Sequence, residues 1–171
     1  MLLDLPPQFT LDELSTELLN VLFRSSEGMA RVAVGNRITS TAEQDHILDE
    51  CLIFHRWYLG KLIEERGMIQ KCVHYRFRAF LRDLEAIRGQ LDLYKSKSES
   101  RHQQYGAILR EAGDAAKLAE NITPALVENI LSGDENCIWT PSIQAGVTDC
   151  IQAFARLMFQ ALSVPMKHGE Q

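Results

Sequence analysis

Long apolar runs are missing from this 171-residue sequence. No stretch approaches the roughly 18 consecutive apolar residues that a membrane-spanning helix needs. The first residues also lack a basic segment followed by an apolar core, so a secretory signal peptide is not predicted. Cysteines are few and scattered, with no C-x-x-C pair; they are Cys51, Cys72, Cys137 and Cys150. Unpaired thiols without a signal peptide predict a cytoplasmic protein with reduced cysteines.

The sequence also lacks the short motifs of common catalytic sites. It contains no Gly-x-Ser-x-Gly nucleophile turn, no Gly-x-Gly-x-x-Gly dinucleotide loop and no Gly-x4-Gly-Lys-[Ser/Thr] phosphate loop. An excess of positive charge is missing as well, because the formal net charge is −5 at pH 7. General nucleic-acid binding is therefore disfavoured, since neutralising phosphates requires surplus Lys and Arg.

Helical periodicity dominates what is present. A hydrophobic content of 46% in a chain of this length predicts one domain with a substantial core. The segment 41–66 is the clearest helix, because Ser40 and Glu43 form a capping box before it and Gly67 follows it. Its apolar residues cover most of the helix circumference, so we expect a central helix surrounded by neighbours.

Further start signals divide the rest of the chain into helices. Thr10 with Glu13 forms a second capping box, and the pairs Thr123-Pro124 and Thr140-Pro141 each combine a cap with a first-turn proline. We expect a break in the first helix near Ser25 to Gly28. The predicted fold is an all-α, single-domain bundle of five to seven helices. Its segments are 1–9 (an apolar lead-in), 10–38 (N-terminal helices), 41–66, 68–122 (a long helix or a hairpin), 124–132, 141–163 and 164–171 (a polar tail).

A heptad pattern runs through 68–122. The stretch 95–101 (KSKSESR) contains no apolar residue, yet the register continues across it with Ser98 and Arg101 in seam positions. Two structures fit: one continuous helix, or a hairpin that turns at the serine-rich stretch; low helix propensity there favours the hairpin. The seam residues are Val73, Phe77, Phe80, Leu84, Ile87, Leu91 and Tyr94, then Tyr105, Ile108, Ala112, Ala115, Ala119 and Ile122.

One candidate metal site lies on the central helix. Glu43, His46 and Glu50 share one helical face, and Glu-x-x-His is the inward-facing unit of di-iron helical bundles. Such a site needs ligands from a second helix, and the chain contains no second Glu-x-x-His. The alternative interpretation is that Glu43 caps the helix and that His46 is a surface residue beside it. We therefore predict that the protein has no cofactor. The alternative is that it binds a divalent metal.

Cys51 and His55 lie one turn apart and could both bind zinc. No other Cys or His pair of matching spacing supplies the remaining ligands. We therefore expect His55 to be a buried histidine that is hydrogen-bonded to a neighbouring helix.

A local basic strip interrupts the acidic balance. Lys71, Arg78 and Arg82 fall on one face of the segment after Gly67, where they could bind phosphate, nucleic acid or an acidic partner. The alternative is a solvated face whose cations pair with nearby carboxylates.

Taken together, these patterns favour a non-catalytic protein over an enzyme. We expect a helical protein–protein interaction or regulatory module that self-associates as a homo-oligomer. Its coiled-coil seam, which includes Phe80, Leu84 and Leu91, packs either within the hairpin or between subunits. A divalent-metal enzyme or sensor built on Glu43, His46 and Glu50 is the first alternative. A small nucleic-acid-associated subunit that uses the basic strip is the second.

Overall fold

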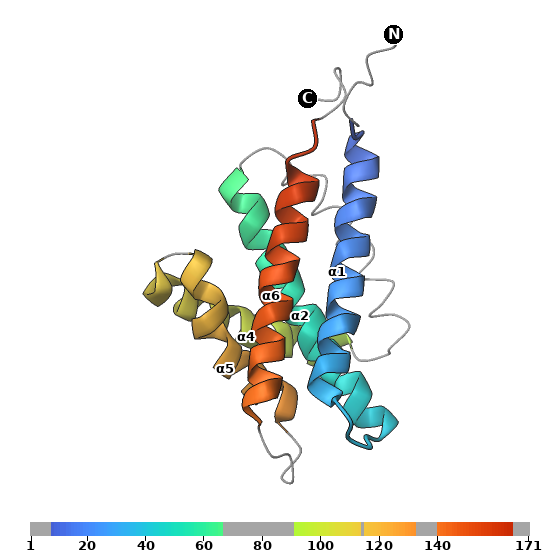
Figure 1. Cartoon of the computed structure of the whole chain (residues 1–171), viewed down its shortest axis with the longest axis vertical. Coiled ribbons are helices and arrows are strands. Elements are labelled where there is room, and N and C mark those ends of the chain that lie inside the picture. The colour runs from blue at the N-terminus through green and yellow to red at the C-terminus, as the bar shows by residue number, and fades with distance from the viewer. Residues whose placement is uncertain (1–7, 67–90, 114, 133–139, 166–171) are drawn as a thin grey trace.

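The computed structural model describes residues 8–66, 91–113, 115–132 and 140–165. This part of the chain is all-helical, as predicted, and contains no strand. Its five helices are arranged as shown in Figure 1. They are α1 (Leu11–Val34), α2 (Thr41–Arg66), α4 (Leu91–Ala112), α5 (Ala115–Leu131) and α6 (Pro141–Leu162). None of them is both long enough and apolar enough to span a lipid bilayer.

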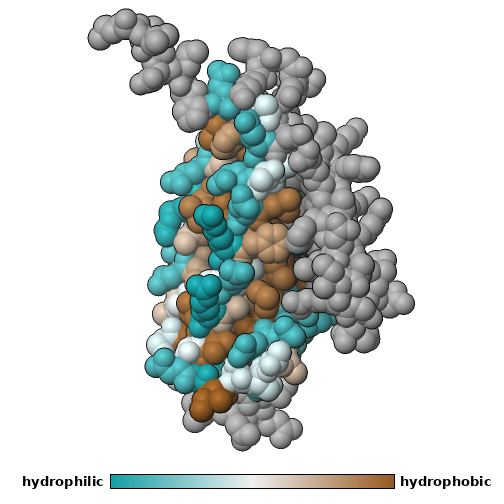
Figure 2. All heavy atoms as spheres, turned by 90° about the vertical axis from the view of Figure 1, so that its right-hand side faces the viewer, coloured by the Kyte–Doolittle hydropathy of each residue, from teal (hydrophilic) through white to brown (hydrophobic). Residues whose placement is uncertain are grey.

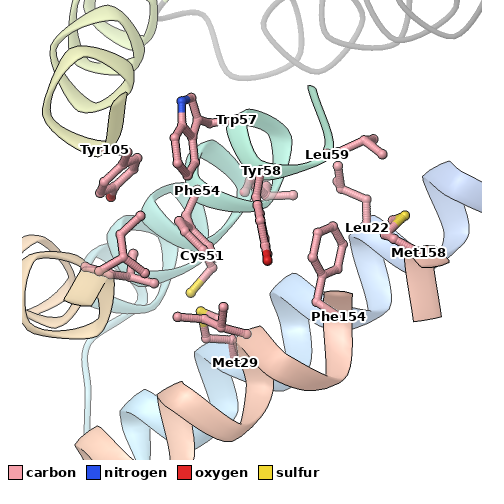
Figure 3. Close-up of a cluster of buried hydrophobic side chains, with 14 of the residues drawn as sticks. Leu22, Met29, Cys51, Phe54, Trp57, Tyr58, Leu59, Tyr105, Phe154 and Met158 are labelled. Atoms are coloured by element: carbon pink, nitrogen blue, oxygen red, sulfur yellow. The ribbon is translucent and has the colours of Figure 1, made fainter. Parts of the chain in front are cut away.

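All five described helices contribute to the apolar core. α1 packs along α6 and also against α2, while α5 contacts α2, α4 and α6. In Figure 3, Cys51 and Tyr58 of α2 face Phe154 of α6 and Met29 of α1, and Tyr105 approaches from α4. The rings of Phe54 and Tyr105 meet edge to face with centroids 5.6 Å apart, an arrangement that aromatic quadrupoles favour. These contacts bring α1, α2, α4 and α6 to one core.

α2 is buried on nearly all sides. Every residue from Glu50 to Leu59 except Arg56 is buried, which agrees with the apolar character expected around the whole helix. Its bounds coincide with the segment predicted from the sequence. At its start, Ser40 Oγ accepts from Glu43 N at 3.2 Å, and Glu43 Oε2 accepts from Ser40 N at 2.6 Å. This capping box satisfies two amides of the first turn.

The caps predicted for α1 and α6 are also confirmed. Thr10 and Glu13 form a reciprocal capping box at the start of α1. Thr140 caps α6 by accepting from Ile143 N, with Pro141 in the first turn. The proline there loses no hydrogen bond, because the first amides of a helix have no intrahelical partner.

The break expected in the first helix near Ser25 to Gly28 is wrong. α1 runs without interruption to Val34. Ser26 faces the interior, where its Oγ donates to Leu22 O at 2.9 Å and meets His55 Nδ1 at 2.9 Å. A serine satisfied in this way is compatible with a helix interior.

The turn expected at the serine-rich stretch is likewise wrong. α4 is continuous from Leu91 to Ala112, and the chain reverses instead at Gly113, whose φ of 66° is a left-handed conformation that glycine adopts without strain. α4 and α5 then lie against each other. Ser98 is buried, so the seam register does place it inward. Tyr105, Ala119 and Ile122 of the predicted seam are buried as well, whereas the seam residues from Val73 to Ile87 lie outside the described residues.

The helix start predicted at Thr123-Pro124 is also wrong, because α5 begins at Ala115 and contains Pro124 in its interior. Pro124 lies on the exposed side of the helix, where a carbonyl that loses its amide partner can meet water. Thr123 Oγ1 donates to Ala119 O at 2.6 Å and contacts Thr148 Oγ1 of α6 at 2.9 Å. The threonine therefore joins two helices instead of starting one.

Candidate functional site

The most concentrated polar arrangement among the described residues surrounds Glu50. Its carboxylate has 0% exposed side-chain area and lies in the middle of α2. Lys97 Nζ approaches Glu50 Oε1 at 3.0 Å. Arg101 donates from Nε to Oε2 and from Nη2 to Oε1, both at 3.1 Å. We call these three residues the Glu50 ion cluster; it joins α2 to α4 through charge-assisted bonds, one of them a two-pronged arginine pair.

His46 extends this cluster toward α5. Its Nδ1 lies 3.2 Å from Lys97 Nζ, and its Nε2 lies 3.1 Å from the carbonyl oxygen of Asn129. An ammonium can only donate and a carbonyl can only accept. The imidazole therefore accepts at Nδ1 and donates from Nε2–H, and both of its nitrogens are occupied within the fold.

Asn129 closes the network on the α5 side. Its Nδ2 donates to Gln104 Oε1 at 2.9 Å and to Tyr105 Oη at 3.1 Å. Burial raises the pKa of the Tyr105 phenol above its usual value, although the Asn129 hydrogen bond opposes that shift. The phenol therefore stays protonated at physiological pH, and it serves as a hydrogen-bond partner inside the core.

The three predicted metal ligands do not converge. Glu43 is occupied by the cap at Ser40, whose backbone and side-chain hydrogen bonds lower the pKa of the glutamate. Glu50 is held by two cations, and His46 is bonded to Lys97 and to α5. Within the described ranges, no three His, Cys, Asp or Glu side chains are placed to hold a metal ion. His74 lies outside these ranges.

The interpretation of Glu43 as a capping carboxylate is confirmed. His46 is not the surface residue expected beside it, because it is half-buried between α2, α4 and α5.

His55 is a buried histidine bonded to a neighbouring helix, as predicted: its Nδ1 meets Ser26 Oγ of α1. Burial lowers its pKa to about 3, which a hydrogen bond to the Cys51 backbone only partly offsets. Its ring packs against Phe154 with centroids 4.4 Å apart. Nε2 has no hydrogen-bond partner among the described residues. Burial also raises the pKa of Cys51. The cysteine therefore stays a thiol beside a neutral imidazole, and the thiolate that acts as a nucleophile is not formed.

Two hollows flank the connection between α1 and α2. One has a volume of about 200 Å³ and lies between this connection, the first turns of α2 and the end of α5. We call it the α2–α5 hollow. A second, of about 380 Å³, lies between the last turns of α1 and the first half of α2. The α2–α5 hollow is lined by Arg37, Thr39, Ala42, Glu43, His46, Ile47, Ile130, Leu131 and Ser132.

The remaining predicted site residues lie outside the described part of the chain or have no described side chain. Lys71, Arg78 and Arg82 of the basic strip are outside it, as are Phe80 and Leu84 of the seam. Leu91 is the first residue of α4, but its side chain is not described.

Sequence reasoning missed the partners of Glu50. Arg101 was correctly assigned to an inward seam position, yet its inward direction was not connected to an acidic residue on the central helix. The sequence did contain a signal for this ion pair. Arg101 falls in an inward-facing seam position, and Glu50 lies in a helix that is apolar around most of its circumference. Asn129 gave no such signal, because a single amide that follows Glu128 on a short amphipathic segment has no periodicity of its own.

No protein-family model, no curated protein and no solved structure matches this chain. Its function must therefore be inferred from the arrangement of its own residues. The polar network fixes three helices relative to one another, and its hydrogen-bonding groups are already occupied by each other.

Proposed function

We propose that this chain is a non-catalytic helical interaction or regulatory module, a single-domain bundle that associates with itself. The observation that carries the proposal is the exposure of Ile38, whose relative accessibility is 104%. Isoleucine is among the residues most often buried. Leaving such a side chain in water forgoes about 1.5–3 kcal/mol relative to burying it. A second protein surface is the simplest means of recovering that free energy.

The interior supports a non-catalytic role. General acid–base catalysis needs a group that titrates near the working pH and can reach the substrate. The Glu50 carboxylate has 0% exposure and two cationic partners. His55 is fully buried, with a pKa of about 3. These buried groups therefore serve packing and orientation instead of proton transfer.

Other exposed apolar residues add less weight. Leu157 and Phe159 of α6 have relative accessibilities of 45% and 60%. Figure 2, which looks onto the α1 side, shows apolar strips between hydrophilic residues and a separate apolar patch near the lower end of the described surface. Singly exposed apolar residues are normal on protein surfaces. Ile38 differs from them because its exposure is complete and it lies beside a hollow.

The first experiment is native mass spectrometry of the untagged chain at neutral pH. Self-association predicts a concentration-dependent species at a multiple of the 19.4 kDa chain mass. A protein that stays monomeric at every concentration contradicts the proposal.

The seam predicted from the heptad pattern is tested separately. If Phe80 and Leu84 lie between subunits, Phe80→Glu combined with Leu84→Glu gives a monomer or an unfolded chain, because a glutamate in an apolar seam buries an unpaired charge. A folded oligomer of unchanged mass would exclude the seam as the contact and leave self-association itself standing.

A further inference from the structure

The connection between α1 and α2 carries the exposed Ile38 and is bonded to both helices at the residues that flank it. On one side, Arg37 donates from Nη2 to Ala33 O at 2.9 Å and from Nε to Val34 O at 3.2 Å, which attaches the connection to the end of α1. On the other side, Gln44 Nε2 donates to Thr39 Oγ1 at 3.1 Å. Ile38 is therefore flanked by two residues that are each bonded to a helix. A backbone segment held in advance loses little conformational freedom on binding.

The α2–α5 hollow adjoins the part of the connection that carries Ile38. Arg37 and Thr39, the residues on either side of Ile38, both line it. Its apolar wall comes from Ile47 of α2 and from Ile130 and Leu131 of α5. A volume of about 200 Å³ is smaller than the roughly 300–1,000 Å³ of pockets for drug-sized ligands. The hollow therefore suits one aliphatic side chain better than a cofactor.

A projecting side chain next to a hollow of matching chemistry is self-complementary. A two-fold axis that passes between them places each Ile38 over the hollow of the other copy, which is the reciprocal arrangement of an isologous dimer. The charges at the hollow are also self-complementary, because Arg37 and Glu43 both line it. The same two-fold operation can set the guanidinium of one copy opposite the carboxylate of the other, and such complementarity fixes orientation.

We propose that two copies of this chain associate through the α1–α2 connection, each inserting Ile38 into the α2–α5 hollow of the other. This inference rests on the proposed self-association and names its surface. The occupant is a second copy because the projection and the hollow adjoin on one chain. The contact is small, so we expect a weak, concentration-dependent dimer rather than a permanent one.

Two variants test the two halves of the contact. Ile38→Glu removes the inserted side chain, and because Ile38 is wholly exposed the fold should be unaffected. Ala42→Phe fills the hollow from an exposed position in the first turn of α2. Each should raise the dimer dissociation constant at least ~100-fold, since both insertions are lost together. Phe159→Glu, on the exposed surface of α6, is the matched control and should leave association unchanged.

Mixing the two variants provides the sharpest readout. The Ile38→Glu chain keeps an open hollow, and the Ala42→Phe chain keeps the inserted isoleucine. Their heterodimer therefore retains one of the two insertions, and sedimentation velocity should show it forming more readily than either homodimer. Weakening by both variants, with partial recovery on mixing, supports the proposal. A wild-type dimer that neither variant weakens overturns this surface but not self-association, whereas a wild type that is monomeric throughout overturns both.

Discussion

The Glu50 ion cluster should respond asymmetrically to the loss of its partners. The carboxylate has 0% exposure, whereas the side chains of Lys97 and Arg101 retain 28% and 22% of theirs. If Glu50 is neutralised, both cations can turn toward water. If the cations are removed, the carboxylate has no route to water and stays buried without a partner. The two perturbations delete the same ion pairs and differ in which charge they leave behind.

The general cost of breaking a buried ion pair sets the scale. Removing one side of a buried ion pair costs about 3–5 kcal/mol when a charge is left without compensation. We therefore expect Lys97→Met combined with Arg101→Met to lower the free energy of unfolding by about that amount. Methionine is chosen because it keeps much of the apolar stem of each side chain. Glu50→Gln should cost less, about 1–3 kcal/mol, which is the usual penalty for a buried polar group with incomplete hydrogen bonding.

Urea unfolding followed by circular dichroism gives these free energies. A third variant, Glu50→Met with both cation substitutions, is the control, because replacing a whole buried cluster by apolar residues is often neutral or stabilising. It should recover most of the loss of the double cation variant. The reasoning is refuted if the double cation variant is no less stable than Glu50→Gln, or if the triple variant is the least stable of the three.

Two further predictions concern the α1–α6 contact and the buried histidine. Gly146→Ala should cost about 1–3 kcal/mol of unfolding free energy, because a Cβ there would lie 2.6 Å from Val32 Cγ1. Gly60→Ala is the control: no heavy atom lies within 4 Å of its added Cβ, so it should stabilise α2 by about 0.5–1 kcal/mol. Equal effects of the two substitutions on the free energy of chemical denaturation would contradict the close approach of α1 and α6. The pKa of His55 falls from its ordinary 6.5 to about 3 on folding, so the unfolded chain takes up a proton first and stability should fall as the pH drops from 6.5 toward 3. His102, whose pKa burial lowers to about 4, acts in the same direction. His55→Phe should therefore reduce the slope of unfolding free energy against pH by up to about 1.4 kcal/mol per pH unit without abolishing it. An unchanged slope would show that His55 is not the buried neutral group.

The helices were predicted well wherever the interactions that define them join residues close together in the sequence. The capping boxes at Thr10 and Ser40 and the cap at Thr140 depend on residues three positions apart, so the sequence alone contains the whole interaction. The central helix could be predicted because its caps are local and because its apolar residues cover most of its circumference. His55 was predicted correctly because a polar residue within such a helix must find a partner on a neighbour.

Errors arose where tertiary contacts outweighed local propensity. Ser26 looked like part of a helix break but is held by Leu22 O and His55. The stretch 95–101 looked like a turn, yet Lys97, Ser98 and Arg101 all face α2 or its surroundings. The ion partners of Glu50 were not predicted, because they lie about fifty residues further along the chain, a separation that no local pattern spans.

The Glu50 ion cluster also explains how α4 finds its place on α2. α2 is apolar around most of its circumference, and apolar packing alone tolerates more than one rotation or translation of a neighbouring helix. We infer that the buried carboxylate restricts that freedom, because the observed register brings Lys97 and Arg101 to it at 3.0–3.1 Å. A displaced helix would leave the carboxylate unpaired. The substitutions described above therefore test specificity as well as stability: the triple methionine variant should remain folded, and its α4 should be less uniquely placed. Broadened side-chain NMR signals for Tyr105 and Trp57, whose rings lie 5.5 Å apart, would reveal that loss, and sharp wild-type-like signals would show that apolar packing alone sets the register.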